Sequence, residues 1–146
     1  MTQENKELLI KDLCARLDTN LVCSIYRIDD YGVGYRDEIL SGYCKDDIWD
    51  EFFFGDDCGI GIDNVSKIKP YLFPLSSMTE EQKKYINDRW GVNENFDFEI
   101  DPNWGKFVVE LGDVVGFINW CYENHLDING LIPKGLAEDA TDKNIY

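Results

Sequence analysis

Residues 21–28 have the sequence LVCSIYRI, and this stretch decides the fold class. Its β-branched and aromatic residues favour a strand. The DDYG that follows at 29–32 favours a turn, and residues 33–40 predict a second strand before Ser41 and Gly42. Two shorter apolar segments, 48–54 and 60–65, are separated by glycines and aspartates. This succession predicts a small antiparallel sheet or a partly open barrel.

Helical patterns flank the strand-rich region. Apolar residues at spacings of three and four predict helices over 4–17 and 113–125, the second with Asp113 as N-cap. Thr79 and Gln82 form a capping-box pattern for a helix over 80–89, and Gly91 favours its end. We therefore expect an α+β fold with about three helices in a single domain, 1–146. The residues expected in its core include Leu13, Leu17, Ile118, and Trp120 or Cys121.

The remaining segments predict extended chain. Lys69-Pro70 and Phe73-Pro74 favour an extended, rigid connector, because proline restricts both itself and the preceding residue. Residues 95–101 alternate between apolar and acidic side chains, which predicts a half-buried strand. Residues 106–111 are its expected hairpin partner.

The composition is strongly acidic. Among 146 residues, 29 acidic side chains face 14 basic ones, which gives a formal charge of −15. Such a charge disfavours direct binding to nucleic acid and to anionic membranes. The apolar fraction of 44% supports a packed core rather than disorder.

Five cysteines, at 14, 23, 44, 58 and 121, are widely spaced and odd in number. This spacing disfavours a disulfide framework or a zinc site. The N-terminal residues lack the pattern of a signal peptide, and no apolar run is long enough to span a bilayer. We therefore expect a cytoplasmic protein.

Three stretches carry a resemblance to a known family: LIKDLCARL at 9–17, IKPYLFPLSSMTEEQ at 68–82, and the C-terminal stretch 117–141 with NGLIPKGLAEDAT. Together they resemble a family of small proteins from phages, prophages and mobile elements of gut Bacteroidota, which has no assigned activity. The resemblance implies an accessory role in a mobile element, a class that includes inhibitors of host defence.

No catalytic constellation emerges from the residue types. His125 is the one histidine, and its place at a helix end favours a capping or core role. The glycine-rich stretches 32–34 and 55–61 lack the lysine and hydroxyl residue of a phosphate-binding loop. The row Asp97, Glu99, Asp101 and Asn103 has strand spacing, whereas a calcium loop wraps around its ion. We predict no enzyme activity, no cofactor and no metal site.

The functional lead is the acidic stretch 29–63, in which eleven acidic side chains alternate with aromatic ones. Carboxylates on a rigid scaffold imitate a row of phosphates, and aromatic side chains serve as interface anchors. The leading hypothesis is a non-catalytic protein that binds and inhibits a basic, nucleic-acid-handling host protein. The predicted partner-binding residues are Asp46, Asp47, Asp50, Glu51, Asp56, Asp57, Trp49, Phe52 and Phe53.

Two alternatives stay open. One is a protein that binds or sequesters a small ligand such as a nucleotide signal, which requires basic side chains to converge in a pocket. The candidates for such a pocket are Arg27, Arg36, Lys67 and Lys69. The other is a structural or regulatory module without a single partner.

Overall fold

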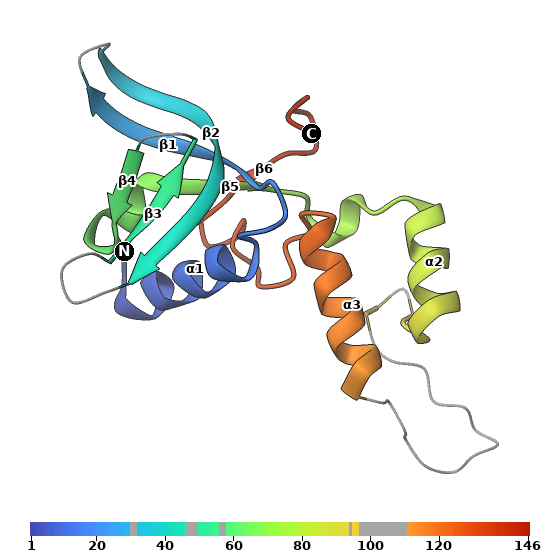
Figure 1. The fold of residues 1–146 in the computed structure, drawn as a ribbon. Helices are drawn as coiled ribbons and strands as arrows, with labels where there is room; N and C mark the ends of the chain where they lie inside the picture. Colours follow the sequence, from blue (N-terminus) through green and yellow to red (C-terminus); the bar gives the residue numbers. More distant parts are fainter. Residues whose placement is uncertain (30–31, 46–49, 56–57, 94, 97–110) are drawn as a thin grey trace.

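The computed structural model describes residues 1–146 except 30–31, 46–49, 56–57, 94 and 97–110. The described residues form an α+β fold, which confirms the predicted class (Figure 1). Its α-helices are α1 (Gln3–Ala15), α2 (Glu80–Trp90) and α3 (Leu111–Glu123), and two short 3-10 helices are η1 (Ile62–Lys67) and η2 (Leu75–Ser77). The strands are β1 (Val22–Asp29), β2 (Gly32–Lys45), β3 (Asp50–Phe54), β4 (Cys58–Gly61), β5 (Ile68–Leu72) and β6 (Glu138–Asp139).

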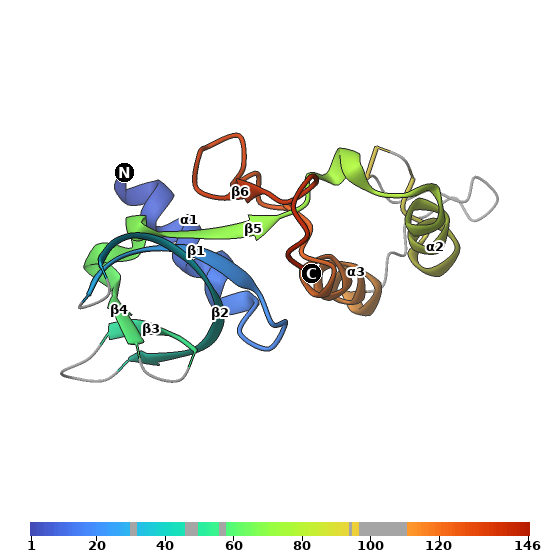
Figure 2. The same ribbon diagram turned by 90° about the horizontal axis from the view of Figure 1, so that it is seen from above.

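The six strands form one strongly curved sheet in the order β4-β3-β2-β1-β5-β6. The first four are an antiparallel meander, and η1 then returns the chain so that β5 pairs with β1. A register shift between Leu40 and Gly42 lies within the 14-residue strand β2, and such bulges bend a strand. Viewed from above, β1 to β5 trace an incomplete ring, which is the partly open barrel expected from the sequence (Figure 2).

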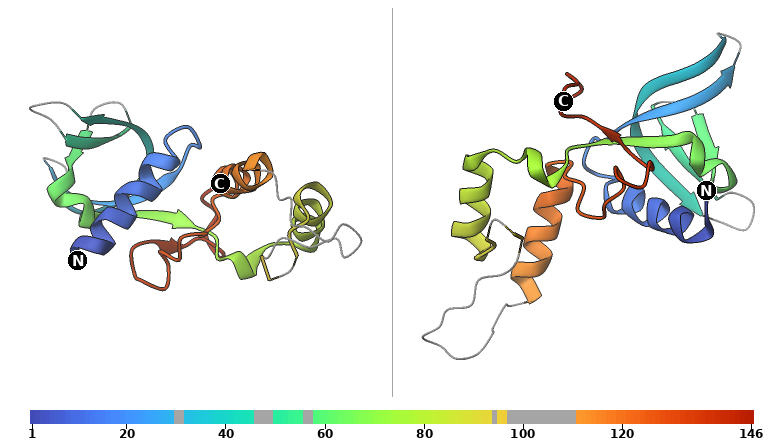
Figure 3. Two further views of the ribbon diagram at one scale, coloured as in Figure 1. Left: turned by 90° about the horizontal axis from the view of Figure 1, so that it is seen from below. Right: turned by 180° about the vertical axis from the view of Figure 1, so that it is seen from behind.

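Helix α1 covers one end of the barrel (Figure 3). Its Leu9 and Leu13 are almost completely buried and belong to the same cluster as Phe52 and Phe54 of β3 and Ile25 of β1. The predicted apolar stripe of the first helix is therefore confirmed as a core-facing stripe. Thr2 caps this helix by accepting a hydrogen bond from the Asn5 N–H.

Helices α2 and α3 form a separate pair with its own apolar cluster. The predicted capping box of Thr79 and Gln82 is present, and Gly91 ends α2 in the left-handed conformation. A Cβ at Gly116 of α3 would lie 2.9 Å from the indole nitrogen of Trp90, so a larger residue here would displace that ring. Cys121 of α3 is fully buried.

A buried ion pair joins the barrel to the helix pair. Asp12 lies on α1 and Arg16, one turn later, is the C-cap residue of this helix; neither side chain is exposed. Arg16 also donates to the carbonyls of Tyr122 and Leu126, and its guanidinium lies 4.7 Å from the centre of the Tyr122 ring. Because the last carbonyls of a helix lack intrahelical partners, Arg16 completes the end of α3 from another element.

His125 lies just beyond α3 and is buried, as the core alternative for this residue predicted. Its ring stacks on Tyr146 with the centroids 4.0 Å apart. The Tyr146 hydroxyl donates to the Tyr71 carbonyl and accepts from the Val22 N–H, so it bridges β5 and β1. Burial and the Arg16 charge lower the pKa of His125 to about 4.

The structure corrects several expectations from the sequence, and others lie outside the described residues. Residues 68–72 are extended, as predicted, but they form a strand paired with β1 rather than a connector. Asp113 is not an N-cap, because α3 begins at Leu111 and places it in the first turn. Ile118 is only half-buried. The predicted strand 95–101 and its partner 106–111 lie largely outside the described residues, and Asn95 and Phe96 form a turn and a bend.

Candidate functional site: the seam between β1 and β4

The outer half of the β1–β2 hairpin projects beyond β3 and β4 (Figure 1). On one side of this ribbon the cross-strand pairs are Tyr26 with Tyr35 and Ile28 with Val33. The two tyrosine rings meet edge to face with centroids 5.2 Å apart. Ile28 is 71% exposed, and Val33 and Tyr35 are each 64% exposed. We call these four side chains the hairpin face.

The opposite side of the same ribbon is charged. Arg36 pairs directly with Ile25, and Glu38 pairs with Cys23. Since residues directly opposite each other lie on the same face of a sheet, these two charged side chains share the face of Ile25 and Cys23, which points into the core. Arg27 lies on this side as well, two residues beyond Ile25. The hairpin therefore turns polar side chains inward and apolar side chains outward, the reverse of an ordinary surface ribbon. Contiguous exposed apolar groups of this kind mark interaction surfaces.

Two strand edges without a ladder partner border the space beside this hairpin. Strand β4 stands at the end of the sheet order and, among the described residues, pairs only with β3. On β1, pairing with β5 covers Cys23 to Ile25 only, so residues 26–29 have β2 on one side and no strand of the described chain on the other. We call the opening between these edges the seam, and η1 closes its inner end.

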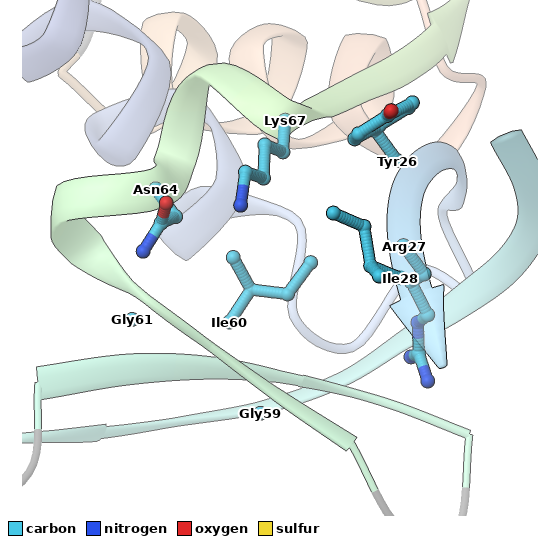
Figure 4. A pocket seen from close by; sticks show the side chains of 8 residues that line it. All are labelled: Tyr26, Arg27, Ile28, Gly59, Ile60, Gly61, Asn64 and Lys67. Atoms are coloured by element: carbon cyan, nitrogen blue, oxygen red, sulfur yellow. The ribbon is translucent and has the colours of Figure 1, made fainter. Parts of the chain in front are cut away.

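The seam contains a pocket of about 270 Å³ (Figure 4). Strand β1 contributes Tyr26, Arg27 and Ile28; β4 contributes Gly59, Ile60 and Gly61; η1 contributes Asn64 and Lys67. In Figure 4 the Lys67 amine and the Ile28 side chain point toward the space beside Ile60, and the Asn64 amide lies on the Gly61 side. The pocket therefore combines an apolar floor with a few polar groups, which is the usual make-up of a binding site.

Arg27 stands at the rim of the pocket with its guanidinium directed away from Ile60 (Figure 4). Its Nη2 donates to Oε2 of Glu38 at 2.6 Å. Its Nε is buried and has no hydrogen-bond partner among the described residues.

Because Gly59 and Gly61 have no side chains, the outer face of β4 exposes its main chain. A Cβ at Gly61 would meet nothing within 4 Å, so the main chain there is open to a neighbour. At Gly59 the corresponding space is filled by the carboxylate of Glu51, which reaches across from β3. Glu51 thus places a negative charge beside the free edge of β4.

Of the nine predicted partner-binding residues, the structure describes Asp50, Glu51, Phe52 and Phe53. The prediction for Phe52 was wrong, because its side chain is fully buried in the barrel core and cannot anchor a partner. Alternation along β3 puts Phe53 on the outer side, where it is half-buried opposite Gly59. The predictions for Asp46, Asp47, Trp49, Asp56 and Asp57 lie outside the described residues.

Most described carboxylates of the stretch 29–63 are engaged within the protein. Asp37 accepts from the Tyr71 hydroxyl at 2.8 Å, and Asp50 accepts from the Tyr43 hydroxyl at 2.7 Å. Glu38 pairs with Arg27, and Asp63 pairs with Lys6 at 3.1 Å. These carboxylates serve cross-strand and interelement contacts on different faces, so this part of the chain shows no continuous acidic row.

The four basic residues considered for a ligand pocket divide between sites. Arg27 and Lys67 line the seam pocket together. Lys69 pairs with Glu138 of β6 and lines a different hollow beside α1, and Arg36 lines neither. The sequence pattern indicated the strands that carry the hairpin face and the seam. The pattern could not show that these strands form a site, because the tertiary fold decides which face of each strand is covered.

No protein-family model, no curated protein and no solved structure matches this chain. No helix within the described ranges has the length and apolar character needed to cross a membrane. Among the same residues, no group of three or more His, Cys, Asp or Glu side chains is arranged to hold a metal ion. The seam is therefore assessed by its own geometry.

Proposed function

We propose that this protein is a non-catalytic binding module that takes an extended segment of a partner protein into the seam, as a strand added to β4. The observation that carries the proposal is the pair of unpaired strand edges, β4 and residues 26–29 of β1, on the two sides of one pocket. An exposed strand edge offers a row of main-chain donors and acceptors, and peptides bind such edges by continuing the sheet.

The hairpin face supports a protein as the partner. Tyr26 and Ile28 belong both to this face and to the pocket lining, so a segment in the seam would continue onto Val33 and Tyr35. Exposed tyrosine and aliphatic side chains next to a groove supply the buried area on which interfaces depend.

The charges of the pocket favour this partner over a small anionic ligand. Arg27 is already paired with Glu38, and Glu51 adds a carboxylate at Gly59. Lys67 is then the one cation of the described lining without an ion pair, which is a weak site for a phosphate group. A peptide main chain needs no net charge in the pocket.

The wider role follows the sequence-based hypothesis. The resemblance to mobile-element proteins supports an accessory function directed at a host protein, and the free thiols of Cys14, Cys23 and Cys121 fit a reducing cytoplasm. We therefore propose a cytoplasmic protein that acts by binding. The acidic-mimic version of this role stays a prediction, because five of its nine residues lie outside the described chain.

The test is a peptide-display selection followed by a steric block. Gly61→Phe adds an aromatic ring to the lining of the seam pocket, and the backbone φ of −59° at this residue suits any side chain. Gly112→Phe on α3 is the matched control, since a Cβ there also meets nothing within 4 Å. Selected peptides should bind the wild type and the Gly112→Phe variant, and lose at least about tenfold in affinity for the Gly61→Phe variant.

Circular dichroism first verifies that both variants are folded. Amide exchange on the complex should show new protection at residues 58–61. A selection that enriches no peptide, or peptides that bind the Gly61→Phe variant as well as the control, would rule out strand addition at this edge.

A further inference from the structure

We infer that the segment bound in the seam carries a basic side chain opposite Gly59, next to an apolar side chain that packs on Ile60. This inference rests on the proposed strand addition and specifies the chemistry of the partner. Three features of β4 and its surroundings lead to it.

The first feature is the alternation of side chains along β4. Ile60 pairs with Phe52 and points into the barrel, where it is 9% exposed. Gly59 and Gly61 occupy the outer side, opposite Phe53 and Glu51. A strand added to the free edge shares this alternation. Its residue beside Ile60 packs on that side chain, and its residue beside Gly59 lies on the outer face.

The second feature is the position of the Glu51 carboxylate. It fills the space that a Cβ of Gly59 would occupy, so no side chain of β4 separates it from the residue of an added strand at that level. Side chains of neighbouring strands at the same level interact directly, and opposite charges there stabilise the pair. A lysine or arginine in the partner satisfies this carboxylate.

The third feature is the distribution of the other charges. Lys67 lies on η1, at the Gly61 end of the seam, whereas Gly59 lies two residues further out. The basic residue of the partner is therefore placed away from Lys67 and next to Glu51. The net charge of −15 accelerates the approach of a basic segment.

Three synthetic peptides test the inference. Each has eight residues in which valine alternates with threonine, and they differ only at a central outward position, which is lysine, glutamine or glutamate. Binding is measured by titration with wild type, Glu51→Gln and Asp88→Asn. Asp88 is an exposed residue of α2, so its replacement makes the same charge change away from the seam.

The lysine peptide should bind the wild type about threefold to fivefold more tightly than the glutamine peptide, and the glutamate peptide should bind weakest. Glu51→Gln should abolish the preference for lysine, and Asp88→Asn should retain it. If all three peptides bind the wild type equally and the Gly61→Phe variant binds none of them, the inference of a basic residue is wrong, whereas strand addition is retained. Absence of binding by every peptide would overturn strand addition itself.

Discussion

The Nε of Arg16 donates to Oδ2 of Asp12 at 2.8 Å, and both side chains are completely buried. Asn129 donates a further hydrogen bond to the same carboxylate. The other donors of Arg16 reach carbonyls of Tyr122 and Leu126, more than a hundred residues further along the chain. This pair therefore fixes the barrel to the end of α3.

Replacing Arg16 by methionine should destabilise the protein by about 3–5 kcal/mol, because Asp12 would remain buried without its counter-charge. Urea unfolding of the Arg16→Met variant measures the loss. The double variant Asp12→Leu/Arg16→Met should recover a substantial part of it, since no buried charge is left. A single variant within about 1 kcal/mol of the wild type would contradict this account of the junction.

His125 should make stability depend on pH. Burial and the nearby Arg16 charge lower its pKa from 6.5 to about 4, so between these values the unfolded chain binds a proton that the folded protein excludes. Stability is therefore full above about pH 7 and falls by about 2–3 kcal/mol as the pH drops from 6.5 to 4. Urea unfolding at a series of pH values measures this slope.

His125→Asn is the matched control for the pH prediction. It removes the titrating ring, and asparagine tolerates the backbone φ of 54° at this position. The fall in stability over this pH range should be smaller in the variant. The same slope in both proteins would show that other groups cause the pH dependence.

Alanine substitutions in α1 and α3 should lower the free energy of unfolding by different amounts. Leu13→Ala on α1 should cost about 2–5 kcal/mol, because the side chain is fully buried against the barrel. Ile118→Ala on α3 should cost less than half as much, because Ile118 is only half-buried. Denaturant unfolding compares them, and an equal loss would indicate that Ile118 is packed as tightly as Leu13.

Asp50 should control the ionisation of Tyr43. The hydroxyl of Tyr43 donates to the Asp50 carboxylate at 2.7 Å, and this hydrogen bond is the main cause that raises the pKa of Tyr43 to about 12. Asp50→Asn removes the charged acceptor, so the pKa of Tyr43 should move toward 10. NMR titration of ring-labelled tyrosine follows the group. An unchanged pKa would leave Asp50 free for the partner-binding role predicted from the sequence.

Local sequence patterns sufficed for the α-helices and for β1 to β3, whereas the predicted strand 60–65 is divided between β4 and η1. The capping box of Thr79 and Gln82 and the terminal Gly91 lie within one element, so their geometry follows from neighbours in the chain. The stripe of α1 likewise needs only a spacing of three and four residues. The overall charge is also a property of the sequence, and it supports an acidic binding protein without showing the surface that binds.

The candidate site required contacts between distant residues. Hydrophobic alternation marks two faces of the β1–β2 hairpin, but the curvature of the sheet decides that the side with Arg36 and Glu38 turns inward and the apolar side stays exposed. Phe52 was predicted as an anchor because its neighbours are acidic. The fold instead directs it into the barrel, where burial of an aromatic ring outweighs the local pattern.

The sequence by itself determined the local elements, their caps and the net charge, because each depends on residues within a few positions of one another. The tertiary structure decided the pairing of β1 with β5, the incomplete closure that leaves the seam, and the burial of Asp12 and Arg16. Those features arise from contacts across about forty to more than one hundred residues, for which a single sequence holds no local signal. They are also the features on which the proposed binding depends.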